Sequence, residues 1–384
     1  MATRALLLVG LLVSSAVPAA AVSDPTFEII ARDCFAGAVA VSADGSSVLS
    51  YHYGGCGGPI YPVVNRWRAG TNTLVTGAGE SLSFGGLSGD GSVVAGGLTP
   101  GGQTTHRAYR WQDGPVEYLG SGTDRARDIS GDASTIVGRG TSGGSSQAYR
   151  HQGGIVTYLG DLPGGTVSSE AWAVNGDGTV IVGRGNSATG DEAFRWQNGS
   201  MQGLGDLDGG AFASEAHDVS PDGSIVVGWG SSASGTEAFR WQNDVMTGLG
   251  LLDGSYATHA YGVAADGTLI VGEAITNPSD FYDGKVAVIW DAQGIHRLED
   301  WLLQKFGLDL NGYDLRSALG VSSDGRTIVG EGVDLNAVSG SDRRIAWVIT
   351  IPEPTTATMM VVGLLSLAAA RRRHGSNAIR SPSA

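Results

Sequence analysis

The sequence predicts an all-β protein, a seven-bladed β-propeller of four-stranded repeats that is closed by its N-terminal strand. Three observations lead to this prediction. Glycine supplies 62 of the 384 residues and only 16% of the residues are charged, a composition typical of short strands joined by tight turns. One turn recurs seven times, and the same series of short strand patterns follows it. Self-similarity at about 40–45 residues is the period of a propeller blade.

The recurring turn sets the register of the repeats. A glycine follows its aspartate in every copy except one, where Ala133 takes that place. An apolar residue stands three positions before the aspartate. A glycine stands six positions after it in every copy but the first, which has Ser50. Asp-Gly predicts a two-residue hairpin turn whose central residues both have positive φ. The turn aspartates are Asp44, Asp90, Asp132, Asp177, Asp222, Asp266 and Asp324.

Each repeat divides into four short strands. A blade cannot bury both faces by itself, so neighbouring repeats must stack and the ring must close. The strand Phe27–Ile30 precedes the first copy, and the last copy ends after its third strand, Ile345–Ile349. The N-terminal strand would therefore complete the final blade and remove a free sheet edge. An open β-solenoid is the alternative. The clearest copy predicts strands at Ala216–Ser220, Ser224–Gly228, Glu237–Trp241 and Val245–Gly250.

Two copies carry a family resemblance. The segments Glu192–Leu207 and Glu237–Leu252 resemble HAF repeats, a set of extracellular bacterial repeats named for a His-Ala-Phe tripeptide. Here the tripeptide reads Glu-Ala-Phe at 192–194 and 237–239, and the missing histidine argues against a special role for that position. The resemblance covers most of residues 36–350. It implies a propeller-like extracellular fold and no defined activity.

The N-terminus has the three parts of a secretory signal peptide, assigned to residues 1–21. Arg4 is followed by the apolar run Ala5–Val13 and then by Pro18 and three alanines, the order of a charged region, an apolar region and a small-residue cleavage site. A membrane span is the alternative, but the apolar run is shorter than the ~20 residues that a bilayer requires. The repeat domain then occupies residues 22–351.

The C-terminus, residues 352–373, resembles a PEP-CTERM sorting signal. Its parts are Pro352, Glu353 and Pro354, the apolar segment Thr355–Ala370, and the cluster Arg371, Arg372 and Arg373. The resemblance implies an exosortase-type membrane peptidase as partner, in a Gram-negative bacterium that makes exopolysaccharide. The apolar helix is marginal for a ~30 Å bilayer core, which favours a transient inner-membrane anchor with the body exported to the cell surface. Residues 374–384 extend past the point where such signals usually stop.

The last spacing between turns is longer than the others and holds an insertion. Leu298, Trp301, Leu302 and Phe306 recur at helical spacing, and Gly307 follows as a stop signal. The pattern predicts a short helix near 298–307 packed on the propeller. A partner-binding helix is the alternative.

The two cysteines, Cys34 and Cys56, flank the first hairpin at nearly symmetric positions about Asp44-Gly45. Export into an oxidising compartment makes a disulfide between them the expectation. Two cysteines this far apart do not suggest a metal or redox site.

Motifs for catalysis or metal binding are not found. The histidines lack zinc-protease spacing, and neither a nucleophile elbow nor a phosphate loop is present. The sequence therefore favours a protein that is not an enzyme and has no cofactor. Asp206–Gly210 could contribute to a calcium site, but a turn-forming role is favoured because calcium needs six to eight oxygen ligands. The net charge of -14 argues against nucleic acid as a partner.

Variation between the copies indicates where a ligand would bind. Positions five before the turn aspartate and just after the recurrent glycine differ between repeats, and both would lie at one rim of a propeller. Aromatic and arginine side chains there suit sugars or a protein partner, and uneven packing is the alternative. The candidates are Arg127, Trp172, His217 and Tyr261 in the first position, and Arg139, Arg184 and Trp229 in the second.

The resulting prediction is an exported, cell-surface or matrix-associated propeller that binds or organises exopolysaccharide or surface proteins without catalysis. The alternative is a propeller enzyme acting on glycans, a lyase or hydrolase. A cluster of His, Tyr, Arg or paired carboxylates in the central channel would favour the enzyme, and a channel of Ala, Val and Ser would exclude it. A calcium-stabilised structural module is a third alternative.

Overall fold

The computed structural model describes residues 24–33, 35–53, 62–76, 82–83, 85–100, 105–280, 284–337 and 343–352. The predicted signal peptide, both cysteines, and the sorting signal from Glu353 onward lie outside these ranges. Residues 25–351 form one compact unit. Within the described ranges, no helix has the length and apolar character needed to cross a membrane.

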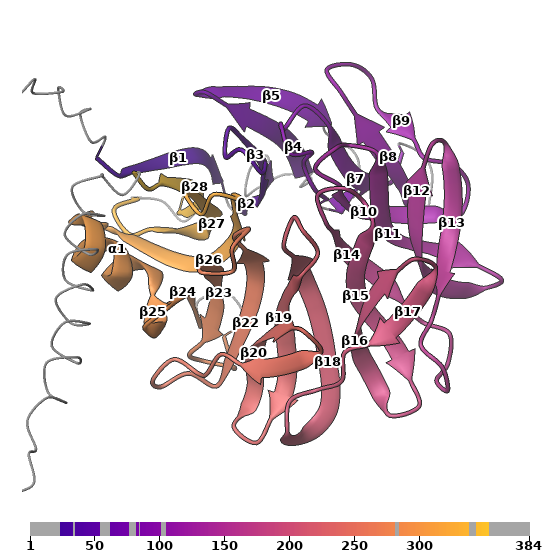
Figure 1. Cartoon of the computed structure of the whole chain (residues 1–384). Helices are drawn as coiled ribbons and strands as arrows, with labels where there is room; N and C mark the ends of the chain where they lie inside the picture. The colour runs from indigo at the N-terminus through magenta and orange to yellow at the C-terminus, as the bar shows by residue number, and fades with distance from the viewer. Residues whose placement is uncertain are drawn as a thin grey trace, which may run out of the picture. The chain divides into compact units, whose positions relative to one another are not determined.

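The described chain is all-β apart from one helix (Figure 1). The repeats are numbered by their turn aspartates, from Asp44 in the first to Asp324 in the seventh. The first strands of the repeats are β2 (Ala36–Val41), β6 (Leu82–Ser83), β10 (Thr123–Ile129), β14 (Glu170–Val174), β18 (Gly209–Val219), β22 (Ala257–Val263) and β26 (Tyr313–Val321). The second strands are β3 (Ser47–Tyr53), β7 (Val94–Leu98), β11 (Thr135–Ser142), β15 (Val180–Ser187), β19 (Ile225–Ser232), β23 (Ile270–Ile275) and β27 (Thr327–Asp334).

The third and fourth strands complete each sheet. The third strands are β4 (Pro62–Arg68), β8 (Arg107–Trp111), β12 (Ser145–Gln152), β16 (Gly190–Gln197), β20 (Gly235–Gln242), β24 (Lys285–Asp291) and β28 (Arg344–Thr350). The fourth are β5 (Thr71–Thr76), β9 (Glu117–Tyr118), β13 (Ile155–Gly160), β17 (Ser200–Gly203), β21 (Val245–Gly248) and β25 (Gly294–Arg297). Five sheets are separate and four-stranded, and the fifth and sixth repeats share an eight-stranded sheet through one parallel pair, Thr236 with Ala257.

The seventh repeat takes its fourth strand from the N-terminus. Strand β1 (Thr26–Asp33) pairs antiparallel with β28, and the register places Phe27 opposite Ile349. In Figure 1 the indigo β1 lies beside β28 at the other end of the colour range. The sheet order is β1-β28-β27-β26, so chain segments more than 300 residues apart belong to one sheet.

The hydrophobic core lies between neighbouring repeats. Phe239 and Trp241 of the fifth repeat, for example, pack against Val180 and Val182 of the fourth. Every core cluster of described residues combines two successive repeats in this way, and one combines the seventh with the first through Val329, Val348 and Ala38. A single repeat therefore has no core of its own, which is why the repeats stack.

In five repeats the recurrent glycine is explained by a bulge in the first strand. In β10 the register shifts between Ala126 and Asp128, and the carbonyl of Arg125 then lies against Gly138, where a Cβ atom would collide with it. The same collision recurs at Gly183, Gly228, Gly272 and Gly330. Close backbone approach, and not a turn, requires glycine at this position.

The predicted turn type is wrong. Gly45 has φ of 71°, but the turn aspartates are not among the residues with positive φ. The N–H of Gly45 donates to the carbonyl of Ser42, and the Asp44 carboxylate accepts the N–H of Ser46. Because the aspartate side chain organises the turn from a negative φ, the connection is a longer turn with one left-handed glycine.

A buried serine two positions before the aspartate completes the turn. Ser220 Oγ donates to Asp222 at 2.6 Å and accepts the N–H of Ile225 at 3.0 Å. Equivalent bonds form at Ser42, Ser88, Ser130 and Ser322. The recurrence of this serine is visible in the sequence as a local signal beside the turn aspartate.

The inserted segment forms α1 (Leu298–Phe306), which Gly307 ends at φ of 70°. Leu298, Trp301 and Leu302 are buried against the sixth and seventh repeats, and the Trp301 indole donates to Asp291 at 2.8 Å. The helix therefore uses its apolar face for packing.

Candidate functional site: the central pocket

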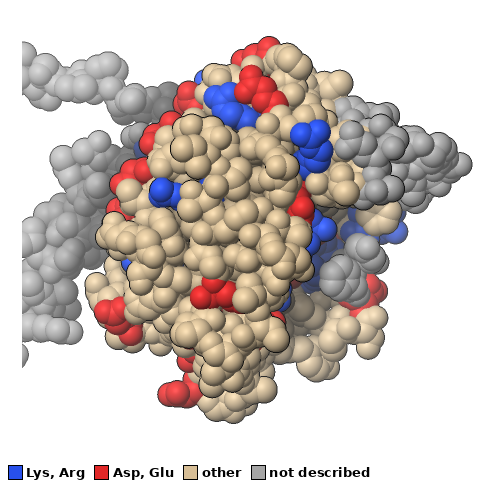
Figure 2. All heavy atoms as spheres, turned by 90° about the vertical axis from the view of Figure 1, so that its right-hand side faces the viewer, with Lys and Arg blue, Asp and Glu red and all other residues tan. Residues whose placement is uncertain are grey.

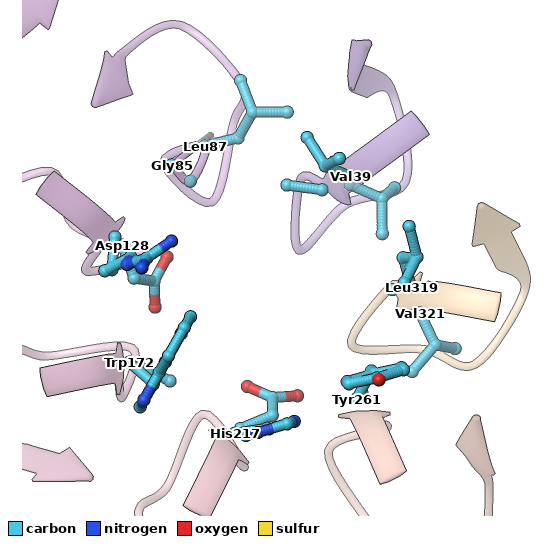
Figure 3. Close-up of a pocket in the computed structure, with 17 residues that line it drawn as sticks. Val39, Gly85, Leu87, Asp128, Trp172, His217, Tyr261, Leu319 and Val321 are labelled. Atoms are coloured by element: carbon cyan, nitrogen blue, oxygen red, sulfur yellow. The ribbon is translucent and has the colours of Figure 1, made fainter. Parts of the chain in front are cut away.

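All seven repeats border one pocket, six of them with their first strands and the second with the segment that follows β6. Its volume is about 190 Å³, and each repeat contributes the residue five positions before its turn aspartate. Figure 3 shows Val39, Trp172, His217, Tyr261 and Leu319 around a common space. The residues at this position are Val39, Gly85, Arg127, Trp172, His217, Tyr261 and Leu319.

The pocket has two unlike walls. Arg127, Trp172, His217 and Tyr261 come from four successive repeats and form a polar and aromatic wall; Figure 3 labels the last three. The opposite wall is apolar, with Leu319, Val39 and Leu87. These four polar or aromatic residues are those that the sequence predicts at one rim, and the structure brings them together.

The side chains of the polar wall stack on one another. The Arg127 guanidinium lies 4.0 Å from the Trp172 ring centroid, and the His217 and Tyr261 rings stack 5.1 Å apart at an angle of 4°. Trp172 and His217 are 5.7 Å apart. Cation–π and stacking contacts of this kind hold side chains in fixed positions, so the wall is a continuous series across four repeats.

Three glutamates on the first and second strands hold side chains of this wall in place. Glu170 accepts the Arg127 Nε–H at 2.6 Å, Glu215 lies 3.2 Å from His217 Nε2, and the Tyr261 hydroxyl donates to Glu273 at 2.9 Å. Burial raises the pKa of Glu215, but the hydrogen bond and charge of His217, with the charges of Arg184 and Arg127, lower it on balance. Burial and Glu273 raise the pKa of Tyr261 well above its ordinary value, so its hydroxyl acts as a donor.

The second set of predicted residues lies outside the pocket lining, next to residues that contact the pocket wall. Arg139, Arg184 and Trp229 stand on the second strands, and none of them borders the pocket. Arg139 lies 3.9 Å from Glu170, Arg184 lies 3.9 Å from Glu215, and the Trp229 ring lies 6.0 Å from His259. Arg139 and Arg184 therefore lie beside acidic residues of the next repeat, and Trp229 lies beside a histidine of the next repeat.

Two aspartates in the pocket were not singled out from the sequence. Asp128 and Asp218 follow Arg127 and His217 directly and border both the central pocket and a second pocket of about 140 Å³. Burial raises the pKa of each carboxyl to about 7, although the backbone N–H groups that donate hydrogen bonds to it lower the pKa in part. The sequence signal for them is that, four positions before the turn aspartate, these two repeats have Asp where the other five have Ala or Gly.

Backbone N–H groups surround Asp206, in the loop for which calcium binding is the alternative to a turn-forming role. Asp206 Oδ1 accepts the N–H groups of Leu207 and Ser231, and Oδ2 accepts that of Ala213, each at 2.8 Å. Among the described residues, no group of three or more His, Cys, Asp or Glu side chains could hold a metal ion.

One side of the outer surface contrasts with the polar and aromatic pocket wall. Figure 2 shows the side that carries β12, β13 and β17 in Figure 1, where uncharged residues cover most of the area and charged ones are scattered. On this side Ile155 of β13 is 67% exposed.

No model of a known protein family matches the chain, and no curated protein matches its sequence. Solved structures do resemble it. A solved structure from a study of two prolyl endopeptidases matches with a TM-score of 0.50 and 10% sequence identity, and the match covers 83% of this chain and 50% of that chain. A putative TolB from Agrobacterium tumefaciens gives 0.44 at 17% identity over 58% of this chain and 84% of that one. TolB from Acinetobacter baumannii matches with a TM-score of 0.45 and 11% sequence identity, over 82% of this chain and 65% of that chain. This chain thus spans about half the length of the prolyl endopeptidase chain that it matches. At such identities the likeness concerns the fold alone, and that fold is a β-propeller.

Proposed function

We propose that this chain is an exported, non-catalytic β-propeller that holds a small group of an extracellular polysaccharide in its central pocket. The observation that carries the proposal is the series Arg127, Trp172, His217 and Tyr261, which four successive repeats place at one pocket wall. A volume of about 190 Å³ is roughly six times the ~30 Å³ share of one liquid water. It suits a single sugar unit or chain end, with polar groups on one side and apolar groups on the other.

The proposal includes a closed ring of seven blades. It is supported by the pairing of β1 with β28 and by the core cluster that joins the seventh repeat to the first. Backbone hydrogen bonds of 2.9–3.1 Å also run from turn to turn in six places. Within the described part of the chain, no such bond runs from the fifth repeat to the sixth, where Pro221 has no N–H to donate. The bonds join Asp44 to Gly89, Gly89 to Gly131, Asp132 to Gly176, Gly176 to Pro221, Ala265 to Ser323 and Ser323 to Ala43.

Cell-surface location rests on the two ends of the sequence. The signal-peptide pattern of residues 1–21 and the PEP-CTERM pattern of 352–373 support export and processing by an exosortase-type peptidase. They also support the link to exopolysaccharide, since the resemblance implies a host that makes it. Surface proteins are the alternative partners.

A pull-down of the purified protein with exopolysaccharide from the producing bacterium tests the proposal. The expected result is retention at low salt that Trp172→Ala combined with His217→Ala abolishes. Tyr256→Ala is the matched control, because Tyr256 is 62% exposed and does not border the pocket. Absence of retention, or equal retention of the double variant, would contradict it.

A glycan-active enzyme is the second candidate, because the pocket does contain His, Tyr, Arg and two carboxyl groups. Each of them is already engaged by the protein: Tyr261 with Glu273, His217 with Glu215, and Asp128 with the N–H of Val174. These contacts favour a fixed binding wall over acid–base chemistry. Release of shorter or unsaturated products from the exopolysaccharide, lost in His217→Ala, would favour the enzyme instead.

A further inference from the structure

Arg125 and Arg139 lie directly opposite each other on β10 and β11. The same pair of positions holds neutral or complementary residues in the other repeats, such as Glu170 with Arg184 and His259 with Glu273. Like charges opposite each other on paired strands are unfavourable. The remaining pairs are Gly37 with Tyr51, Ser83 with Gly97, Glu215 with Trp229 and Ser317 with Glu331. The third repeat alone combines two cations here.

The positive charge of this cluster exceeds its negative charge. Arg127 contacts the Glu170 carboxylate at 2.6 Å and Arg139 lies 3.9 Å from it, while Arg125 is attracted by Glu170 without an ion pair. Arg125 has no ion-pair partner among the described residues. Asp124 attracts it more weakly and is hydrogen-bonded to Thr141.

Donors in the cluster are also left without acceptors. The Nε atoms of Arg125 and Arg139 are buried and have no hydrogen-bond partner within the described part of the chain. A buried guanidinium nitrogen without an acceptor is costly. An oxyanion would offer such acceptors, because its oxygens match the fork of an arginine.

The surrounding groups respond to this excess of charge. Burial lowers the pKa of His106, and the charges of Arg125 and Arg139 lower it further. Burial likewise lowers the pKa of Arg125, followed by the charges of Arg127 and Arg139. The cluster therefore creates a positive potential in a chain whose net charge is -14.

We propose that Arg125, Arg127 and Arg139 form an anion subsite beside the central pocket, which takes the carboxylate or sulfate groups of an acidic polysaccharide. The inference rests on the proposed function and names its substrate class. Arg127 belongs to both features, since it also stacks on Trp172 in the pocket wall. A sugar unit in the pocket would thus have its acidic group, or that of its neighbour, within the reach of the cluster.

Binding of defined polymers to the purified full-length protein tests this subsite. Polygalacturonate carries carboxylates, heparin carries both carboxylates and sulfates, dextran sulfate carries sulfates alone, and dextran is neutral. We expect calorimetry to show binding of polygalacturonate, dextran sulfate or both, but not of dextran. Arg125→Gln and Arg139→Gln should each lower the affinity for the acidic polymer about tenfold or more, which is the effect of losing one charge-assisted hydrogen bond. The matched control is Arg110→Gln, because Arg110 lies on β8 and bonds Gln112 outside the cluster.

Thermal unfolding adds a readout that does not depend on the polymer. Sulfate at matched ionic strength should stabilise the unsubstituted protein more than it stabilises Arg125→Gln. Without sulfate the variant should be at least as stable as the unsubstituted protein, because the repulsion between Arg125 and Arg139 is removed. Equal polymer affinity of parent and variants, or equal binding of dextran, would overturn the subsite. If host exopolysaccharide is retained by Arg125→Gln and Arg139→Gln alike, the proposed function stands and the subsite fails. If only the acidic polymers bind, through these arginines, the subsite stands and the link to exopolysaccharide fails.

Discussion

The carboxylate of Asp128 in the third repeat accepts the backbone N–H of Val174 in the fourth at 3.0 Å. Asp218 in the fifth repeat makes the same bond with Val263 in the sixth, at 2.8 Å. This second bond spans the junction at which Pro221 has no N–H for a turn-to-turn hydrogen bond. The two aspartates therefore link successive repeats at the level of the central pocket.

Stability should fall as these aspartates ionise. The pKa of each is raised by burial from an ordinary 3.8 to about 7, so the folded state binds the proton more tightly than the unfolded state. The stabilisation is complete below about pH 4 and is lost as the pH rises through about 7, with an upper limit of roughly 4 kcal/mol per group. Urea unfolding between about pH 5 and pH 8 measures this slope.

Asp128→Asn and Asp218→Asn should flatten that slope, because an amide does not titrate. Asp222→Asn is the control, since hydrogen bonds from Ser220 and Ser224 lower the pKa of Asp222. Its contribution is present above the unfolded pKa and is lost as the pH falls, so its removal should affect only the acid side. An unchanged slope in both pocket variants would show that these carboxyls are ionised in the folded protein at neutral pH.

The buried turn serine should contribute measurably to stability. Ser220→Ala leaves the N–H of Ile225 without its acceptor, and we expect a loss of about 1–2 kcal/mol. The sixth repeat offers the reverse experiment, because Ala264 occupies the serine position and is 2% exposed. Ala264→Ser should gain about 1 kcal/mol if the bond pattern transfers. Denaturant unfolding of the two variants checks both signs, and a destabilised Ala264→Ser would argue against equivalent turns.

The repeat register could be predicted because its signals are local. The Asp-containing turn and the glycine six residues later reflect one hairpin and one bulge, and both involve residues close in sequence. The turn type was mistaken because dipeptide preference does not show that the Asp44 side chain organises the loop.

The pocket wall could be predicted only in part. Arg127, Trp172, His217 and Tyr261 vary at a position where the framework repeats, which marks them as facing a common space. The links from Asp128 to Val174 and from Arg127 to Glu170 depend on how successive repeats dock. Neither the spacing nor the composition of one repeat contains that information.

A disulfide between Cys34 and Cys56 stays a prediction, since both residues lie outside the described ranges. The strands that flank them are paired: Ala36 lies opposite His52, and the N–H of Tyr53 donates to the carbonyl of Phe35 at 3.0 Å. We expect unreduced, unfolded protein to show no reactive thiol, and the Cys34→Ser, Cys56→Ser variant to lose about 3 kcal/mol. Thiol labelling with and without reductant checks it, and two labelled cysteines before reduction would refute the pairing.

Removal of β1 tests whether the ring is closed by the N-terminal strand. Without residues 26–33, β28 keeps its pairing with β27 but loses its partner on the other edge along the whole strand, and Asp334 loses its ion pair with Arg32. An exposed, apolar strand edge invites association with other chains, so we expect aggregation or a broad, less cooperative unfolding transition. A protein that begins at residue 24 is the control, and a synthetic peptide of residues 24–33 should restore a monomer on size-exclusion chromatography. A truncated protein that stays monomeric and unfolds at the same temperature would favour the open solenoid, because such a fold gains nothing from joining its two ends.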